Sequence, residues 1–188
     1  MKLAVLAALL LLSTPAWAQA DHDAGRRMAD QTTHIQSLNF MDGEWRGTAI
    51  MKQPDGSSMT LTQTERVGSL LNGQIKLIEG RGYSADGITR FNAFAVVSWD
   101  PDQQAYSMRS HAMGNVGDFQ FEPTADGFKW TVPAGPAKIE YVATIKDGMW
   151  HEVGSYLMPG QPARPFIEMK LQRLGNSTWP VSTPVSVK

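Results

Sequence analysis

Turn-forming dipeptides recur along the chain at short intervals, and they limit the length of every element between them. Asp-Gly or Asn-Gly occurs at 55–56, 72–73, 86–87, 126–127 and 147–148, and proline-containing turn signals follow at 100–101 and 159–160. Asp-Gly and Asn-Gly suit tight turns with positive φ, the geometry that joins antiparallel strands. The intervals leave room for strands and not for long helices.

The segments between these turns alternate between apolar and polar residues with the period of two that strands show. For example, Phe128, Trp130 and Val132 alternate with Lys129 and Thr131. One side of each strand is therefore expected to face a core and the other side water. The pattern predicts about ten strands, near 45–53, 59–68, 74–83, 89–99, 105–112, 117–123, 127–133, 138–146, 149–158 and 165–174.

Short connections between many antiparallel strands favour an all-β, up-and-down β-barrel. Closure into a barrel removes the two exposed edges of a sheet, whereas a sandwich would need longer crossovers. The chain contains no cysteine, so a hydrophobic core must hold it together, and its ten Met and six Trp suit that role. We predict one barrel domain over residues 39–174.

The two ends of the chain differ from this pattern. Lys2, the apolar run 3–12 and Ala16-Trp17-Ala18 resemble a signal peptide over residues 1–18, with cleavage after Ala18 and a periplasmic or secreted product. That run is about half of the roughly 20 residues that a spanning helix needs, so we expect no membrane span. Residues 19–38 are expected to form an arm or short helix, and residues 175–188 a flexible tail.

The charge of the chain argues against one class of partner. The formal net charge is −1, and acidic and basic residues are interspersed. Nucleic-acid binding requires a basic stripe or patch, so no nucleic-acid partner is expected.

Short motifs along the predicted strands resemble a known family. The opening Gly43-Glu44-Trp45 is similar to the Gly-x-Trp of lipocalins and fatty-acid-binding proteins, the calycin superfamily. In order and spacing, the further motifs resemble a bacterial lipocalin-like family known only as a domain of unknown function. These motifs lie at 63–67, 78–80, 93–96, 109–111, 126–130, 150–154 and 166–169. Many lipocalins have an Arg of the last strand stacked on the Trp of this motif; this sequence has no obvious equivalent, and Arg173 is the residue that could take that part beside Trp45. The resemblance carries over no catalytic residue.

Polar residues of the strands are the candidates for a binding site inside such a barrel. Arg109 and His111 share one side of their strand, as do Gln63 and Glu65, and His151 shares a side with apolar residues. The predicted ligand is small, largely apolar or amphipathic, and lipid-like or carboxylate-bearing. Arg109 and a His would hold its head, and aromatic side chains its body. The candidate ligand-binding residues are Gln63, Glu65, Arg109, His111, Trp130 and His151.

Several other interpretations remain open at this point. Glu65 and Arg109 could form a surface pair of little energy, or could serve with a His as an enzyme site. One His, at 111 or 151, could be an axial ligand to haem; no metal site is predicted, because no ligand-spaced His pair occurs. A barrel filled by its own side chains is a third possibility. Carboxylates that could pair for acid–base chemistry lie at Glu65, Glu79, Glu152 and Glu168.

Overall fold

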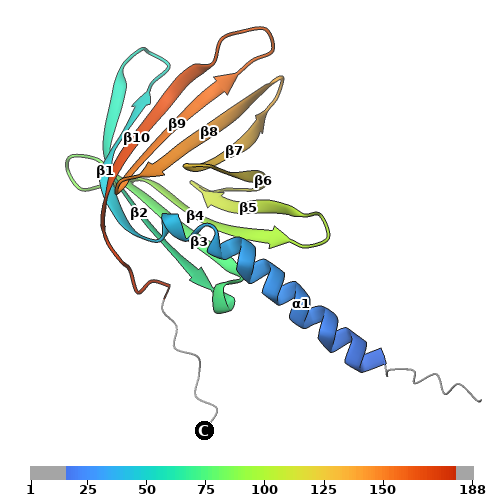
Figure 1. The fold of residues 1–188 in the computed structure, drawn as a ribbon. Helices are drawn as coiled ribbons and strands as arrows, with labels where there is room; N and C mark the ends of the chain where they lie inside the picture. The colour runs from blue at the N-terminus through green and yellow to red at the C-terminus, as the bar shows by residue number, and fades with distance from the viewer. Residues whose placement is uncertain (1–15, 181–188) are drawn as a thin grey trace, which may run out of the picture.

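The computed structural model describes residues 16–180, with side chains from Asp23 onward, so most of the predicted leader and residues 181–188 of the tail lie outside the described residues. One helix and one short 3₁₀ turn precede ten strands, and a second 3₁₀ turn lies between two of them (Figure 1). The elements are α1(Ala16–Gln36), η1(Asn39–Met41), β1(Gly43–Lys52), β2(Ser58–Leu70), η2(Leu71–Gly73), β3(Ile75–Tyr83), β4(Thr89–Asp100), β5(Ala105–Ala112), β6(Asn115–Thr124), β7(Gly127–Ala134), β8(Ala137–Lys146), β9(Met149–Leu157) and β10(Arg164–Gly175).

The strands close into a barrel. Each strand pairs antiparallel with the next strand along the chain, and β10 returns to pair with β1. Trp45 of β1 thereby lies opposite Glu65 of β2 on one side and Arg173 of β10 on the other. The predicted all-β, up-and-down barrel of ten strands with an N-terminal helix is confirmed.

Most of the predicted turns have the backbone geometry that their residues favour. Gly56, Gly87 and Gly148 take φ values of +84°, +80° and +75° at hairpin turns. Gly127 differs, because it is the first residue of β7 and does not have positive φ. A Cβ there would lie 2.0 Å from the carbonyl oxygen of Ala143 on β8, so glycine is required by close strand contact instead.

One end of the barrel is filled by the C-terminal half of α1 and by η1, and we call it the closed end. Ile35, Leu38 and Met41 are fully buried there against the core. The indole N–H of Trp45 donates a hydrogen bond to the carbonyl oxygen of Met41 at 2.9 Å, and its ring meets Trp150 edge to face. The hairpins β1–β2, β3–β4, β5–β6, β7–β8 and β9–β10 form the opposite end, which we call the open end.

Aromatic contacts fix α1 on the closed end. The ring of His34 stacks on Trp99 with a centroid distance of 3.6 Å, and the indole N–H of Trp99 donates to Asp30 at 2.8 Å. The hydroxyl of Tyr106 donates to the carbonyl oxygen of His34 at 2.9 Å. The first turns of the helix extend past the barrel (Figure 1), and Met28 is exposed.

The residues that the family resemblance singles out lie together at the closed end. The guanidinium of Arg173 lies 5.9 Å from the centre of the Trp45 ring and donates to the carbonyl oxygen of Asp42 at 2.9 Å. Gly43 joins η1 to β1 with φ +125°, a conformation that favours glycine. These contacts tie the first and last strands to the segment that fills the closed end, formed by the C-terminal half of α1 and η1, which we call the plug.

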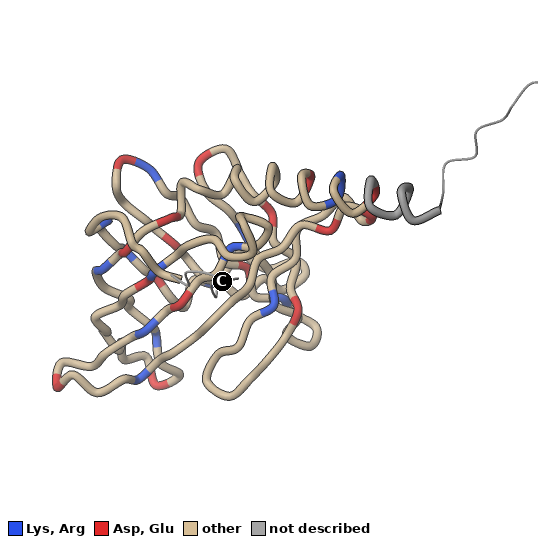
Figure 2. Tube along the Cα trace, turned by 90° about the horizontal axis from the view of Figure 1, so that it is seen from below, with Lys and Arg blue, Asp and Glu red and all other residues tan. Residues whose placement is uncertain are grey.

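Part of the predicted flexible tail packs on the outer wall. Arg66 of β2 lies over the ring of Trp179 at 4.6 Å, and Phe94 of β4 meets the same ring edge to face. The chain is therefore held against the barrel up to about Pro180. Along the chain trace, Lys and Arg positions are interspersed with Asp and Glu positions over strands and turns (Figure 2).

Candidate functional site

The barrel encloses a cavity of about 270 Å³. Every strand except β6 contributes to its lining, which is mostly apolar and aromatic. Residues near the open ends of their strands, such as Met51, Phe91 and Ala112, belong to the lining, so the cavity reaches toward the open end. The full lining is Ala49, Met51, Leu61, Gln63, Glu65, Ile78, Gly80, Phe91, Ala93, Ala95, Met108, Ser110, Ala112, Phe128, Trp130, Tyr141, Trp150, Glu152, Phe166, Ile167 and Met169.

Gln63 and Glu65 of β2 point into this cavity and are almost completely buried. The side-chain amide of Gln63 donates to Oε1 of Glu65 at 2.7 Å, which orients the carboxyl group. The neighbouring strand β3 carries Gly80 opposite Glu65, where a Cβ would lie 2.6 Å from Oε1. Glycine at that position therefore leaves room for the Glu65 carboxyl group.

A second carboxyl group, that of Glu152 on β9, lines the same cavity. It accepts hydrogen bonds from the indole N–H groups of Trp130 at 3.2 Å and Trp150 at 3.0 Å. Tyr141 of β8 stacks on Trp130 with a centroid distance of 4.1 Å and an interplanar angle of 5°. A Cβ at Gly154 would lie 2.7 Å from the Tyr141 ring, so this glycine makes room for the stack.

Burial changes the protonation of these groups. Burial, together with the nearby charge of Glu152 and against the hydrogen bond from Gln63, raises the pKa of Glu65 to about 8. Burial also raises the pKa of Glu152, although two indole N–H donors oppose this, and it raises the pKa of Tyr141 to about 12. Around neutral pH the Glu65 carboxyl group is therefore largely protonated.

The lining contains no cation among residues 23–180, since no Lys, Arg or His side chain of that range faces the cavity. The polar groups that do face it are carboxyl, amide and hydroxyl groups. The cavity therefore combines apolar walls with a few polar groups, none of which is cationic.

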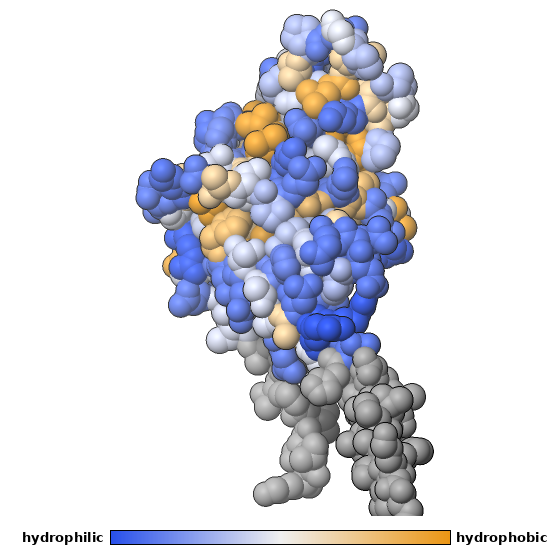
Figure 3. All heavy atoms as spheres, turned by 45° about the vertical axis from the view of Figure 1, so that its right-hand side comes forward, coloured by the Kyte–Doolittle hydropathy of each residue, from blue (hydrophilic) through white to orange (hydrophobic). Residues whose placement is uncertain are grey.

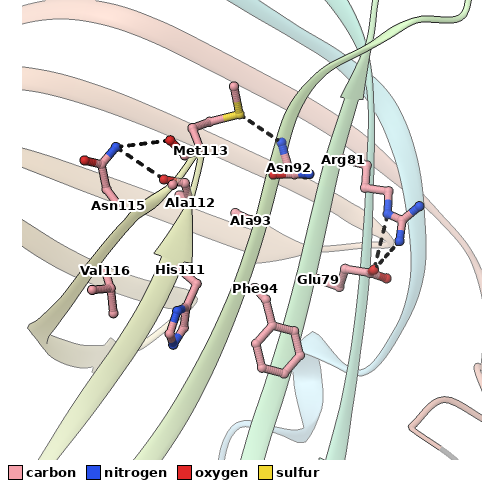
Figure 4. Close-up of a pocket in the computed structure, with 11 residues that line it drawn as sticks. Glu79, Arg81, Asn92, Ala93, Phe94, His111, Ala112, Met113, Asn115 and Val116 are labelled. Carbon is pink, nitrogen blue, oxygen red and sulfur yellow. Dashed lines mark hydrogen bonds and ion pairs between the residues drawn. The ribbon is translucent and has the colours of Figure 1, made fainter.

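Three of the six candidate residues lie on the outer wall, and the prediction that they point inward is wrong. Arg109 pairs with Asp118 of β6 at 2.7 Å, and the His151 imidazole lies 2.9 Å from Glu168 of β10, with all four side chains exposed. His111 is also exposed and lies on the outer face beside Phe94 (Figure 4). Met108 of β5 and Trp150 of β9 are buried in the core. Because side chains alternate along a strand, the odd-numbered residues of these two strands face outward.

These positions argue against two of the alternatives, the enzyme site and the haem site. The predicted cluster of Glu65, Arg109 and a His does not form, because a barrel wall separates the first residue from the others. His111 and His151 likewise cannot bind a haem inside the cavity. Of the four carboxylates considered for pairing, Glu65 and Glu152 share the cavity, whereas Glu79 and Glu168 lie on the outer wall.

A second depression, of about 470 Å³, lies on the outer face of β3, β4 and β5 (Figure 4). Its charged side chains, Glu79 and Arg81, bind each other at 2.7 Å, and Glu79 also pairs with Arg66. Met113 and Asn115 of the β5–β6 hairpin form its edge. Because this depression is open to solvent and its charges are already paired, we consider the interior cavity the stronger candidate site.

Between Asp23 and Pro180, no group of three His, Cys, Asp or Glu side chains is arranged to hold a metal ion. No helix in the described part of the chain is both long and apolar enough to cross a bilayer.

The closed barrel with an internal cavity places the protein in a structural class whose members can enclose one small ligand. The chain matches no known family model and no curated protein. Among solved structures it is similar to the protein of the "Crystal Structure of Rv2717c from M. tuberculosis", with a TM-score of 0.56 and 12% identity over 75% of this chain and 97% of the other. A likeness at that identity supports the barrel fold alone.

Proposed function

We propose that the protein binds a small, largely apolar ligand inside its barrel. The observation that carries this proposal is the apolar cavity, into which a few polar side chains, chiefly Gln63, Glu65 and Glu152, project from the walls. Apolar walls with a few convergent polar groups are typical of small-molecule sites. A barrel filled by its own side chains would lack such a cavity.

The size of the cavity limits the ligand. At about 30 Å³ for each water-sized group, 270 Å³ holds roughly nine non-hydrogen atoms. Movement of flexible lining side chains, such as Met51 or Met108, would enlarge this space. The expected ligand is thus smaller than a typical fatty acid.

The open end is the proposed route of entry. Ile88, Met113 and Met158 lie in the hairpin turns of that end and are exposed. In the space-filling view, apolar side chains lie among polar ones on the half of the surface away from the chain ends (Figure 3). Short turns at this end can move without disturbing the plug at the closed end.

Export and family membership are also parts of the proposal. The pattern of residues 1–18 supports a cleavable leader and a periplasmic or secreted product. The Gly-x-Trp opening and the motifs of the later strands support the lipocalin-like family. Both rest on the sequence.

Native mass spectrometry of the protein purified without its predicted leader tests the proposed function. We expect the purified protein to carry a bound compound of low mass, or to gain such a mass after it is soaked with small apolar compounds. Binding at 100 times the dissociation constant should stabilise the native state by about 2.7 kcal/mol and raise the melting temperature. A protein that shows neither added mass nor a thermal shift with any such compound would contradict the proposal.

A further inference from the structure

We propose that the ligand of the barrel cavity is a protonated amine with a short apolar body, whose ammonium group binds between the carboxyl groups of Glu65 and Glu152. This inference rests on the proposed function and specifies its ligand class. It replaces the carboxylate-bearing ligand that the sequence favours, because the cations expected to hold a carboxylate lie on the outer wall.

The charge of the cavity is the first argument. Two carboxyl groups line one small apolar space, and no cation from residues 23–180 faces them. A buried carboxylate without a counter-charge is costly and two of them repel each other, which is why Glu65 keeps its proton around neutral pH in the protein alone. A ligand that brings one positive charge allows Glu65 to ionise, whereas an anionic ligand adds to the repulsion.

The hydrogen bonds of Glu65 are the second argument. Its Oε1 accepts from Gln63, and no donor among the described side chains binds Oε2. Every fully enclosed side-chain oxygen or nitrogen in the described part of the chain has a partner, so Oε2 must be accessible from the cavity. Once the carboxyl group loses its proton, Oε2 is an acceptor that is held in place and open to the cavity, which suits an N–H donor from the ligand.

Aromatic side chains are the third argument. Trp130, Tyr141 and Trp150 line the cavity around Glu152. The indole N–H groups of both tryptophans point at the carboxyl group, which fixes their rings beside the position proposed for the ammonium group. These rings present their N–H edges to the carboxyl group, so they orient it and exclude water around it, and a charge-assisted hydrogen bond from an ammonium group is stronger where water is excluded.

Proton release should accompany this binding. The titratable groups that share the cavity with Glu65 are Glu152 of β9 and Tyr141 of β8, and the cavity-lining residues of β1 and β3 carry none. Glu79, on the outer side of β3, also raises the pKa of Glu65 through its charge. Since burial holds the pKa of Glu65 near 8, an ammonium group must displace a proton around neutral pH. As the pH increases toward about 8, the affinity for the amine should therefore rise by up to about tenfold per pH unit.

Calorimetry with three probes of similar size tests the inference. The probes are phenethylamine, phenethyl alcohol and phenylacetate, which are cationic, neutral and anionic around neutral pH. We expect phenethylamine to bind most tightly, with affinity that increases from about pH 6 to pH 7.5. Glu65→Gln should weaken its binding by about 30-fold and change that of the alcohol little.

Glu168→Gln is the matched control, because it removes a carboxyl group from the outer wall and should leave all three affinities unchanged. If the alcohol or phenylacetate binds as tightly as the amine, the amine inference is wrong and the proposed function stands. If none of the probes binds and no other small compound does, the proposed function itself fails. Should Glu65→Gln not fold, the pH dependence of phenethylamine binding to the unaltered protein decides, and a flat profile overturns the inference.

Discussion

Replacing Glu65 with glutamine is expected to stabilise the barrel at about pH 8 by about 2–4 kcal/mol. Burial raises the pKa of Glu65 to about 8 in the folded protein, from an ordinary value of 4.5. The folded state therefore holds a proton that the unfolded state releases between these two values. The free energy of unfolding must fall as the pH rises through this window, and glutamine, which does not titrate, removes that loss.

Urea unfolding at several values from about pH 5 to pH 8 measures this effect. The unaltered protein should lose stability relative to Glu65→Gln across the range. Glutamine can still accept the hydrogen bond from Gln63, so the local packing is retained. Glu168→Gln should not change the slope above about pH 6, because Lys170 and His151 lower the pKa of that carboxyl group. If the free energy of unfolding of Glu65→Gln and of the unaltered protein changed in parallel with pH, Glu65 would have an ordinary pKa and the prediction would be wrong.

Replacing Trp45 with alanine is expected to destabilise the protein by about 3–5 kcal/mol. Its ring is almost completely buried at the closed end, against Trp150 and under Arg173. Truncation leaves a cavity and removes the hydrogen bond to the carbonyl oxygen of Met41, which holds η1 in place. The plug formed by α1 and η1 should then loosen.

Chemical denaturation with Trp179→Ala as the control checks this second prediction. Trp179 is only partly buried on the outer wall, so its truncation should cost much less than that of Trp45. Trp45→Phe should recover part of the loss, because the ring is retained without its N–H donor. Equal costs at the two tryptophans would contradict the structural role given to the closed end.

The turn chemistry of the sequence predicted the barrel well. Asp-Gly and Asn-Gly pairs set the strand limits locally, and short hairpins between strands leave few topologies available. The β5–β6 hairpin was the weakest part of this pattern, because its turn is formed by Met113 and Gly114, both with positive φ, without an Asp or Asn signal. Local backbone preferences could be read in advance, since they depend on neighbouring residues alone.

The candidate site was predicted only in part, because the side of a strand that faces inward depends on the whole barrel. On β5, Met108 and Ala112 alternate with Arg109 and His111, and this apolar side could have shown that the charged side faces water. On β9 the choice was harder, because Trp150 lies on one side and Val153 and Leu157 on the other. Apolar residues on both sides gave no preference, and the inward position of Glu152 was missed.

The approach of Glu65 and Glu152 could not be read from the sequence. They lie on β2 and β9, which are not neighbours in the barrel, so their meeting depends on closure through β1 and β10. Two glycines are consistent with this arrangement once the structure is known, since Gly80 leaves room for Glu65 and Gly154 leaves room for Tyr141. Those glycines were interpretable only once their cross-strand neighbours were known.

Methionine methyl NMR tests most directly whether the interior of the barrel is the binding site. Met51, Met108 and Met169 line the cavity, whereas Met28 and Met149 are exposed elsewhere, and Met113 lies in the outer depression. Titration with whichever of the three probes binds most tightly should shift the three interior methyl signals and leave the exposed ones in place. Shifts at Met113 with unchanged interior signals would place the ligand on the outer wall and contradict an internal site.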